Sequence, residues 1–313
     1  MIFHICHPIN DWPPNAFFKA WGKPMDRRFC TLHINQIGRT DSLPFGTYLF
    51  SDLELFSEGQ KELLATVWDQ LAEYPENAVL QNHPLRAISR YDLLKKLYES
   101  GQNLFRALRL SELPSDLRFP VFLRMEHDHK GSRSPLIENW DQLESEAAKL
   151  VLDGLNPNRL LAVEYLETID EKGLYRKYSY FKIGQRFIPR HIFFSRNWVN
   201  KDPDIAGDEQ IREERAFLES NPHEDFIRDA FALAQIDYGR IDYSIMDGKL
   251  QVWEINTNPI VTLPMQKYER KHIANQEFFA LQALAAFQEL DCIKDEGRVP
   301  ISLRWPLQIT AHR

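Results

Sequence analysis

Three residues in a hairpin-like stretch late in the chain have side chains that bind hard metal ions. Asp242 lies in the run IDYSIM, Glu254 and Asn256 lie in the run KLQVWEIN, and Asp247-Gly248 between the runs is a strong two-residue turn signal. Such a hairpin places Asp242 opposite Glu254, and residues two apart, such as Glu254 and Asn256, share one face of a strand. Two carboxylates and an amide oxygen suit Mg²⁺, which is usually completed by water and substrate phosphates. On the residues alone, solvated acidic side chains at strand ends followed by a turn are an equally good explanation.

Composition narrows the class of protein that these residues can serve. The chain has 313 residues, is 43% hydrophobic, and carries a net charge of -7, which argues against a nucleic-acid partner. Cys6, Cys30 and Cys292 lie far apart without a C-x-x-C spacing, so we expect reduced thiols rather than disulfides or a zinc site. The first residues lack an export signal and no long apolar run occurs, so we expect a cytoplasmic protein without a membrane span. His4 and His7 have no nearby His or Cys partner and are expected to be structural or exposed.

The stretch 46–83 reads as strand, helix, strand. GTYLFSDLEL is rich in β-formers, SEGQKELLATVWDQLAEY has the apolar spacing of a helix, and AVLQN resembles a short buried strand. Ser57 and Gln60 stand in the spacing of a capping box, in which each side chain binds the other residue's free backbone N–H. A βαβ unit predicts a parallel sheet in the N-terminal lobe.

Sheet and helix alternate through the rest of the chain. A helix is expected at SRYDLLKKLYES, strands at PVFLRM and LLAVEYL, and between the strands a helix that begins at Asp141 with Glu144 completing a capping box. YRKYSYFKIG and QRFIPRHIFF predict an antiparallel hairpin with its turn at Gly184. Two helices, EQIREERAFLES and EDFIRDAFALAQ, precede the metal-binding hairpin. A last helix is expected at 267–291, and the tail after Asp295 has no readable pattern.

The run IDYGRIDYSIMDGKLQVWEINTNP, residues 236–259, resembles the metal-binding segment of the ATP-grasp superfamily. That segment has an Asp, then a hairpin, then an E-(I/V)-N-x-(N/x)-P signature, and the match includes the spacing. In the superfamily the corresponding residues hold two Mg²⁺ ions against the β- and γ-phosphates of ATP. The resemblance therefore implies that Asp242, Glu254 and Asn256 bind metal, with Glu254 bridging the ions and Mn²⁺ as an alternative metal.

The run FPVFLRMEHDHKGS at 119–132 resembles the strand and glycine loop that cover the phosphates in this superfamily. It departs from the pattern because Arg124 stands where many members have Lys, and because the loop has one glycine, Gly131, followed by Ser132. Arg90 stands near the position of a second phosphate-binding Lys. Arginine preserves the charge and binds phosphate bidentately, with a different geometry. Taken singly, such an arginine is more often a surface charge.

The run LLAVEYLETID is similar to the hinge strand that binds adenine through backbone groups. The resemblance implies adenine contacts at Glu164, Tyr165 and Leu166. An acidic side chain after them, with Asp170 preferred, would face the ribose hydroxyls. A solvated acidic turn is an equal alternative for Asp170.

Basic residues after the hinge bind the γ-phosphate and the acceptor carboxylate in the superfamily. The resemblance implies this catalytic role for Arg190 and Arg196 in IPRHIFFSRNW, with Arg190 the first candidate, because paired positive charge stabilises phosphoryl transfer. His191 alternates to the opposite face of its strand and is expected to be structural. Arg240, as a catalytic cation, and Lys182, as a nucleotide-binding one, are weaker candidates.

The resemblance covers roughly residues 80–290 and implies an α/β fold of the α+β grasp type, in which a βαβ-containing lobe precedes a two-part ATP-grasp domain. The predicted limits are 1–85 for the N-terminal lobe, 86–290 for the ATP-grasp domain with a lid subdomain at about 116–163 and a C-terminal subdomain at about 164–290, and 291–313 for a C-terminal tail.

Enzymes of this superfamily, including those similar to glutathione synthetase, mostly activate a carboxylate as an acyl phosphate that an amine or thiol then attacks. The resemblance thus implies an ADP-forming, Mg-ATP-dependent ligase for small-molecule or peptide carboxylate and amine substrates. The stretch 197–210 is expected to supply part of the acceptor pocket. A small-molecule kinase on the same fold and a non-catalytic nucleotide-binding protein remain alternatives, because the sequence does not show what receives the γ-phosphate. A homodimer is left open.

Overall fold

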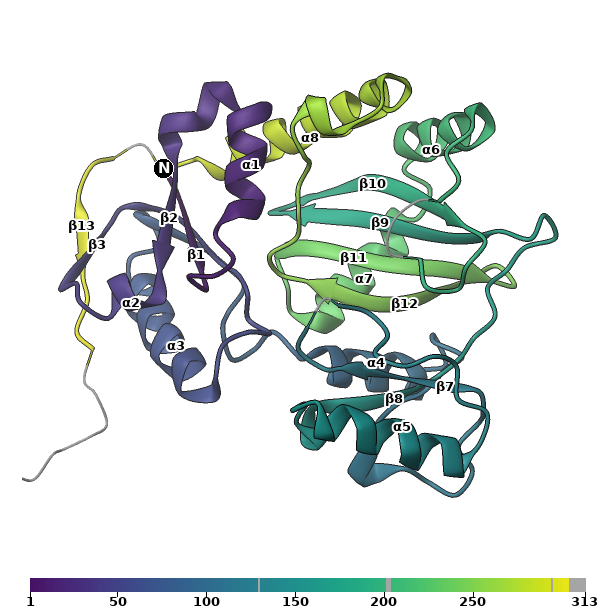
Figure 1. Cartoon of the computed structure of the whole chain (residues 1–313). Helices are drawn as coiled ribbons and strands as arrows, with labels where there is room; N and C mark the ends of the chain where they lie inside the picture. The colour runs from purple at the N-terminus through teal and green to yellow at the C-terminus, as the bar shows by residue number, and fades with distance from the viewer. Residues whose placement is uncertain (129, 201–203, 294, 304–313) are drawn as a thin grey trace, which may run out of the picture.

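The computed structural model describes residues 1–128, 130–200, 204–293 and 295–303. Part of the predicted acceptor stretch, residues 201–203, and the last residues of the predicted tail, 304–313, lie outside the described residues. The described chain forms three β-sheets of three or four strands and one two-stranded sheet, with helices against them (Figure 1). The predicted mixed α/β fold is confirmed, because a parallel sheet and antiparallel sheets occur together. The domain limits given above stay a prediction.

The N-terminal lobe is built on a four-stranded parallel sheet with the order β2-β1-β4-β5. The β1 and β4 strands are buried along their whole length, as expected for a parallel sheet with cover on both faces. The predicted βαβ unit is confirmed as β4-α3-β5, and its capping box forms between Ser57 and Gln60. The lobe contains β1 (Ile2–Cys6), α1 (Trp12–Ala20), β2 (Phe29–His33), α2 (Ile34–Ile37), β3 (Ser42–Pro44), β4 (Gly46–Phe50), α3 (Glu58–Ala72) and β5 (Ala78–Gln81).

A smaller antiparallel sheet with the order β6-β8-β7 follows, with α4 and α5 beside it (Figure 1). The helix predicted from Asp141 instead starts at Trp140, because Asn139 is the capping residue and its side chain accepts the N–H of Gln142. The prediction of a capping box with Glu144 is therefore wrong. The elements are α4 (Arg90–Glu99), β6 (Ala107–Arg109), β7 (Val121–Met125), α5 (Trp140–Leu152) and β8 (Leu160–Glu164).

The central sheet is antiparallel with the order β10-β9-β11-β12, and both predicted hairpins are confirmed. Gly184, Asp247 and Gly248 have φ values of 60°, 48° and 75°, as tight hairpin turns require. The last predicted helix begins later than expected, at Ile273, after two short 3₁₀ turns. The elements are β9 (Tyr175–Ile183), β10 (Arg186–Ser195), α6 (Asp208–Ser220), α7 (Glu224–Ala234), β11 (Tyr238–Met246), β12 (Lys249–Asn256) and α8 (Ile273–Leu290).

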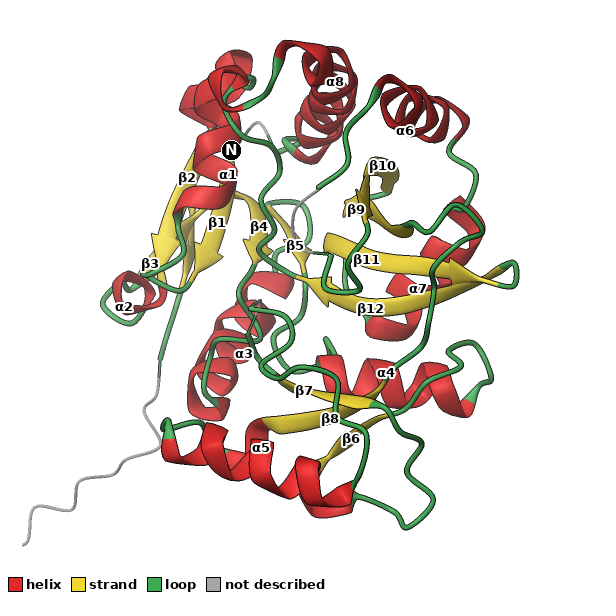
Figure 2. Ribbon diagram, turned by 45° about the vertical axis from the view of Figure 1, so that its right-hand side comes forward, coloured by secondary structure: helices red, strands yellow, loops and turns green. Residues whose placement is uncertain are grey.

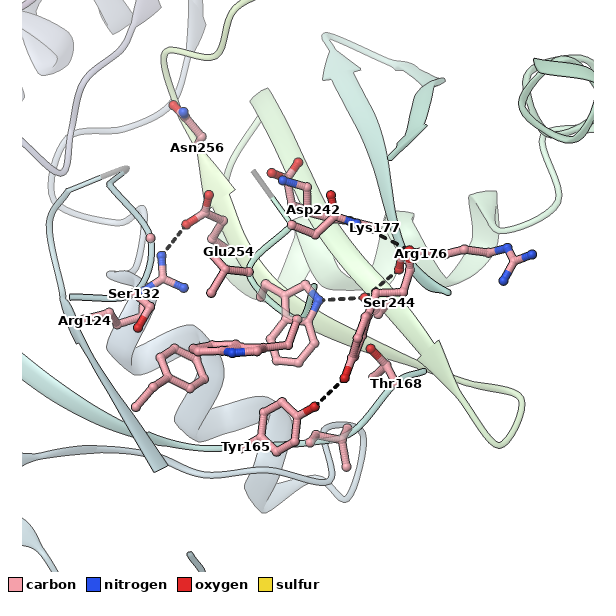
Figure 3. A pocket seen from close by; sticks show the side chains of 18 of the residues that line it. Arg124, Ser132, Tyr165, Thr168, Arg176, Lys177, Asp242, Ser244, Glu254 and Asn256 are labelled. Atoms are coloured by element: carbon pink, nitrogen blue, oxygen red, sulfur yellow. Dashed lines mark hydrogen bonds and ion pairs between the residues drawn. The ribbon is translucent and has the colours of Figure 1, made fainter. Parts of the chain in front are cut away.

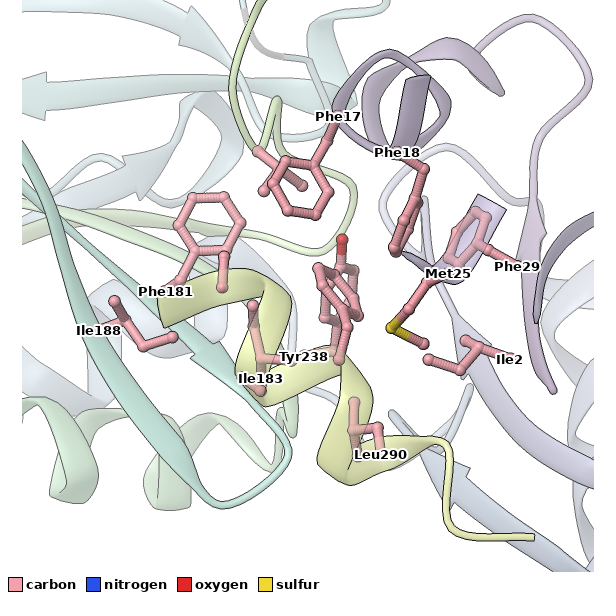
Figure 4. Packing of buried hydrophobic residues seen from close by; sticks show 14 of the residues in the cluster. Ile2, Phe17, Phe18, Met25, Phe29, Phe181, Ile183, Ile188, Tyr238 and Leu290 are labelled. Atoms are coloured by element: carbon pink, nitrogen blue, oxygen red, sulfur yellow. The ribbon is translucent and has the colours of Figure 1, made fainter. Parts of the chain in front are cut away.

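An apolar cluster joins the N-terminal lobe to the central sheet (Figure 4). Phe17 and Phe18 of α1 and Ile2 of β1 pack with Phe181 of β9 and Tyr238 of β11, and α8 lies in the same cluster. Burial of such side chains is the main stabilising term available to hold two lobes together. The chain then returns to the first lobe, where β13 (Arg298–Pro300) pairs with β3.

The central sheet lies above the smaller β6-β8-β7 sheet, and the N-terminal lobe lies at the side of both (Figure 2). None of the helices in the described part of the chain combines the length and the apolar character needed to cross a membrane.

Candidate functional site

A cavity of about 410 Å³ lies between the small sheet and the central sheet (Figure 3). Its lining comes from segments far apart in the sequence, so only the folded chain assembles it. The lining residues are Phe122, Arg124, Gly131 and Ser132 from β7 and the loop after it; Tyr165, Leu166 and Thr168 after β8; Tyr175, Arg176, Lys177, Arg240, Asp242, Ser244, Trp253, Glu254 and Asn256 from the central sheet; and Trp198, Val199 and Asn200 after β10.

The β11–β12 hairpin carries the charged floor of the cavity. Asp242 pairs with Glu254 and Arg240 pairs with Asn256, so the predicted pairing of the two carboxylates is confirmed and all four residues line the cavity. The register shifts between Asp242 and Tyr243, and such a bulge turns successive side chains toward the same side. Trp253 consequently lines the cavity beside Glu254.

Arginines hold both carboxylates. Arg240 donates from Nε to Oδ1 of Asp242 at 2.7 Å and from Nη2 to Oδ2 at 2.9 Å. Arg124 and Arg90 each donate from Nη2 to Oε2 of Glu254, at 2.6 and 2.7 Å. Burial lowers the pKa of Arg240, but the Asp242 carboxylate outweighs it and the pKa lies above its usual value.

The donor set fits a hard divalent cation that a substrate helps to bind. The residues described in the structure contain no group of three or more His, Cys, Asp or Glu side chains that could hold a metal ion. Asp242 and Glu254 provide two carboxylates, and Asn256 adds an amide oxygen that accepts the N–H of Asn258 at 2.8 Å. Mg²⁺ is commonly held by one or two carboxylates with phosphates and water completing its shell. The set therefore fits Mg²⁺ together with a phosphate ligand better than a metal alone.

The small sheet contributes a buried cation, Arg124, to the cavity lining. The guanidinium of Arg124 is buried, and burial, with the Arg90 charge next, lowers its pKa. Its Nε finds no hydrogen-bond partner among the described residues. A buried donor without a partner costs free energy, which an anion bound in the cavity would recover. Gly131 and Ser132 line the same cavity as Arg124, and their role as a phosphate loop stays a prediction.

Arg90 does not line this cavity. It donates from Nη1 to the carbonyl oxygens of Met125, Glu126 and Asp128, at 2.8 to 3.0 Å, and from Nη2 to Glu254. Arg90 therefore anchors the chain leading to the Gly131 loop and reaches the cavity only through the Glu254 carboxylate. This position corrects the prediction that it binds phosphate directly.

The other end of the cavity is aromatic. The Trp198 ring contacts the rings of Phe122 and Tyr165, with centroids 5.1 and 5.8 Å apart, and Trp253 stacks on Phe105 at 4.7 Å. Flat apolar rings at one end and charges at the other are suited to a ligand that has a planar base and an anionic tail.

The hinge strand offers fewer backbone groups than predicted. The N–H of Glu164 donates to the carbonyl of Arg106 and that of Tyr165 to the carbonyl of Pro120, both at 2.9 Å. The N–H of Leu166 donates to none of the described residues. Leu166 is thus the remaining backbone donor of the three residues predicted to contact a base.

The side chain of Glu164 lies outside the cavity lining. Both of its oxygens are engaged: Oε1 accepts from Arg106 at 2.6 and 2.8 Å, and Oε2 pairs with Arg118. Burial opposes ionisation, but the two guanidinium groups bring the pKa of Glu164 below its ordinary value. This carboxylate is a structural ion-pair partner within the small sheet.

Asp170 and Lys182 also lie outside the cavity lining. Asp170 pairs with Arg176 and accepts the N–H groups of Lys172 and Leu174, so it shapes its own turn. Lys182 lies nearer the turn end of β9, where Nζ donates to the carbonyl of Ile236 at 2.8 Å. Neither side chain takes the nucleotide-binding position that was predicted for it.

Arg190 in β10 and Arg196, the residue after β10, were predicted to be catalytic, but neither lines the cavity. A register shift between Pro189 and His191 leaves Arg190 unpaired in the ladder, and its Nε donates to the carbonyl of Val261 at 2.8 Å. Arg190 is buried over the ring of Phe279 in α8. Arg196 is exposed beyond the end of the strand. Among the predicted catalytic arginines, Arg240 lines the cavity.

His191 lies behind the metal-binding face, as a structural residue would. Its Nε2 is 2.9 Å from Oγ of Ser179, and that hydroxyl donates to Oδ1 of Asp242 at 2.8 Å. Burial, and then the charges of neighbouring cations, bring the pKa of His191 well below its usual value, so the ring is neutral.

Several lining residues were missed by the sequence interpretation. Lys177 stands two positions before Ser179, which pairs with Asp242 in the adjacent strand. That alternation would have indicated Lys177 once the register of β9 against β11 was known. Trp253 carried no signal, because its position depends on a bulge, whereas Trp198 lies in the stretch 197–210 that was expected to line an acceptor pocket.

No family model matches the sequence, and no curated protein matches it. Similar solved structures include D-alanine–D-alanine ligase from Bacillus anthracis complexed with ATP, at 14% identity and a TM-score of 0.49, covering 92% of this chain and 98% of that chain. They also include a RimK domain ATP-grasp protein from Sphaerobacter thermophilus, at 11% identity and a TM-score of 0.48, covering 92% of this chain and 98% of that one.

An L-amino acid ligase from Bacillus licheniformis is similar at 13% identity and a TM-score of 0.44, covering 96% of this chain and 78% of that chain. One of these structures, the RimK domain protein, has ATP-grasp in its name. The identities and TM-scores are too low for the likeness to carry an argument about function. The assignment of this chain therefore depends on its own residues and site.

Proposed function

We propose that this chain is an ATP-grasp enzyme that binds Mg-ATP in the cavity and ligates a carboxylate to an amine or thiol, releasing ADP. The observation that carries the proposal is the hairpin face with Asp242, Glu254 and Asn256, which lines the cavity together with the buried Arg124, the ion-pair partner of Glu254. Oxygen ligands beside a buried cation suit a metal–phosphate complex.

The nucleotide would lie with its base among the aromatic rings and its phosphates between Arg124 and the hairpin. The free N–H of Leu166 would donate to an acceptor nitrogen of the adenine ring. The cavity volume of about 410 Å³ falls within the range of roughly 300–1,000 Å³ typical of ligand pockets. The cavity is therefore of a size that suits a ligand, and its distribution of charge supports the placement of the base among the rings and the phosphates near Arg124.

Asp242, Glu254 and Asn256 would hold Mg²⁺ in this complex. The ion, when bound, supplies neutralisation of phosphate charge and orientation of the γ-phosphate. The residues of the chain do the remaining work: Arg124 binds phosphate oxygens, and Arg240 and Lys177 present positive charge where the γ-phosphate meets a substrate carboxylate. Fixed charges of this kind stabilise the charge that develops in phosphoryl transfer. The buried Arg190 and the exposed Arg196 are left out of this proposed machinery.

In the proposed reaction a substrate carboxylate oxygen attacks the γ-phosphorus of ATP, giving an acyl phosphate and ADP. An amine or thiol then attacks the acyl carbon, and inorganic phosphate leaves as the new bond forms.

The test is ADP release measured against a panel of carboxylates and amines, singly and in pairs. Turnover that needs both partners supports ligation, whereas ADP release with a hydroxylated compound alone would favour the kinase alternative. Glu254→Gln should abolish turnover, and Arg186→Gln, which breaks an exposed pair with Glu289 far from the cavity, should not. Absence of both nucleotide binding and turnover in the unaltered protein would refute the proposal.

A further inference from the structure

Both carboxylates of the metal-binding face are already neutralised by the protein. Asp242 forms a two-point pair with Arg240, and Glu254 receives one hydrogen bond each from Arg90 and Arg124. Three guanidinium groups against two carboxylates leave this cluster with an excess positive charge. A free divalent cation approaching the cluster meets repulsion rather than an open anionic site.

The pairs lie where solvent screens them poorly. The side chains are 5% exposed for Asp242, 14% for Glu254 and 9% for Arg124. Breaking such a pair without a new partner leaves a buried unpaired charge, which is strongly unfavourable. A metal ion that took Asp242 alone would leave Arg240 in that state.

Phosphate groups remove this penalty. An anion placed between the walls of the cavity can accept hydrogen bonds from Arg124 and Arg240, because guanidinium groups bind phosphate with the same two-point geometry as carboxylate. The Nε of Arg124 is buried and has no hydrogen-bond partner among the described residues, so a shift of this guanidinium toward an anion breaks no hydrogen bond at that atom. The carboxylates are then released to a cation.

We propose that the arginine pairs gate the metal site, so that a divalent cation binds to Asp242 and Glu254 only with the nucleotide, whose phosphates take over Arg240 and Arg124. This inference rests on the proposed Mg-nucleotide function of the cavity. Because such coupling is reciprocal, the cation raises nucleotide affinity by the same factor as the nucleotide raises cation affinity. Arg240 is in this scheme a gating residue as well as a phosphate-side cation.

The experiment is a titration with Mn²⁺ followed by electron paramagnetic resonance, in which bound Mn²⁺ loses the signal of the free ion. The unaltered protein should bind Mn²⁺ when a non-hydrolysable ATP analogue is present, more tightly than the analogue binds it in protein-free solution, and should show no comparable binding without the analogue. Arg240→Gln removes the competitor for Asp242 and should raise the nucleotide-free affinity for Mn²⁺ by about tenfold or more, since a hydrogen bond to a charged group is worth about one such factor.

Two further variants make the result specific. Arg240→Lys keeps the charge but loses the two-point geometry, so its nucleotide-free affinity for Mn²⁺ should lie between the other two. Arg186→Gln removes an exposed arginine paired with Glu289 and should behave like the unaltered protein. Circular dichroism melts establish that each variant is folded.

The outcomes separate the gate from the function. Equal Mn²⁺ binding with and without the ATP analogue, or an Arg240→Gln affinity no higher than that of the unaltered protein, would overturn the gate and leave the proposed function standing. If Arg240→Gln does not fold, the Arg240→Lys variant and the unaltered protein decide the question. Failure to bind ADP, with or without Mn²⁺, would overturn the proposed function and the gate together.

Discussion

A buried carboxyl group links the N-terminal lobe to the segment that follows the metal-binding face. Asp52, after β4, is fully buried and accepts hydrogen bonds from the N–H of His7 at 3.0 Å, Nδ2 of Asn10 at 2.6 Å and Nδ2 of Asn258 at 3.0 Å. Burial, and then the nearby Glu54 carboxylate, raise the pKa of Asp52 from 3.8 to about 7 despite these donors. We predict that this group makes the stability of the protein depend on pH.

The sign follows from which state holds the proton. The folded protein keeps the Asp52 proton up to about pH 7, whereas the unfolded chain loses it near 3.8. The contribution of Asp52 to stability is therefore complete below the unfolded pKa and is lost as the pH rises through about 7. At about 1.4 kcal/mol per pKa unit, the free energy of unfolding should lose about 2.5 kcal/mol between pH 5 and pH 8 through this group.

The perturbation that isolates the effect is Asp52→Asn, which has almost the same shape and cannot ionise. Urea unfolding of the unaltered protein and of Asp52→Asn at pH 5, 6, 7 and 8 gives the difference in unfolding free energy at each pH. Subtraction cancels other titrating groups, such as His4, whose pKa burial lowers to about 3. The stability of the unaltered protein relative to Asp52→Asn should fall by about 2.5 kcal/mol from pH 5 to pH 8. A difference that is flat or rises with pH would refute the reasoning.

Three further outcomes test the placement of individual residues. Glu164→Gln leaves the buried partner of Arg106 and Arg118 uncharged, so it should lower the free energy of unfolding by about 3 kcal/mol while ADP affinity changes little. Urea unfolding measures the first effect and calorimetric ADP titration the second. Lost affinity with unchanged stability would contradict the structural role of Glu164. Leu166→Pro removes the hinge N–H and should weaken ADP binding by about tenfold, whereas Leu166→Ala should not; equal affinities for the two variants would exclude this contact. Trp253→Leu removes a ring at the aromatic end of the cavity and should weaken ADP binding by about threefold to tenfold in the same calorimetric titration; unchanged affinity would place the base elsewhere.

Local signals in the sequence were sufficient for most elements. The capping pair of Ser57 and Gln60 is formed by residues three apart, and the turn at Asp247-Gly248 needs two residues that tolerate positive φ. The register set by this turn continues to Tyr243 and Val252, and the pairing of Asp242 with Glu254 then depends on the bulge that leaves Trp253 unpaired. The helix α5 starts at Trp140 and not at Asp141. Asn139 and Asp141 are both good capping residues, and the conformation of the folded backbone determines which of them caps the helix.

Alternation along a strand misled wherever a bulge intervened. Arg190 was expected to face the phosphates, but the register shift in β10 leaves it unpaired, and its guanidinium lies against Val261 and α8. In β12 the bulge leaves Trp253 unpaired, and this side chain lines the cavity although the sequence did not predict it. A bulge inserts one residue into a ladder, and its position depends on the partner strand, which lies far away in the sequence.

The sequence by itself determined the hairpin, its oxygen ligands and the order of helices and strands, because these depend on residues that are neighbours along the chain. Only the tertiary structure decided which cations reach the ligands. Arg90, Arg124 and Arg240 pair with the carboxylates, Lys177 lines the cavity, and Lys182 does neither. The physical reason is that a charged side chain takes its partner from whatever the packing of separate sheets brings within a few ångströms, and neither that packing nor the resulting arginine–carboxylate pairs are encoded in the spacing of residues along one strand.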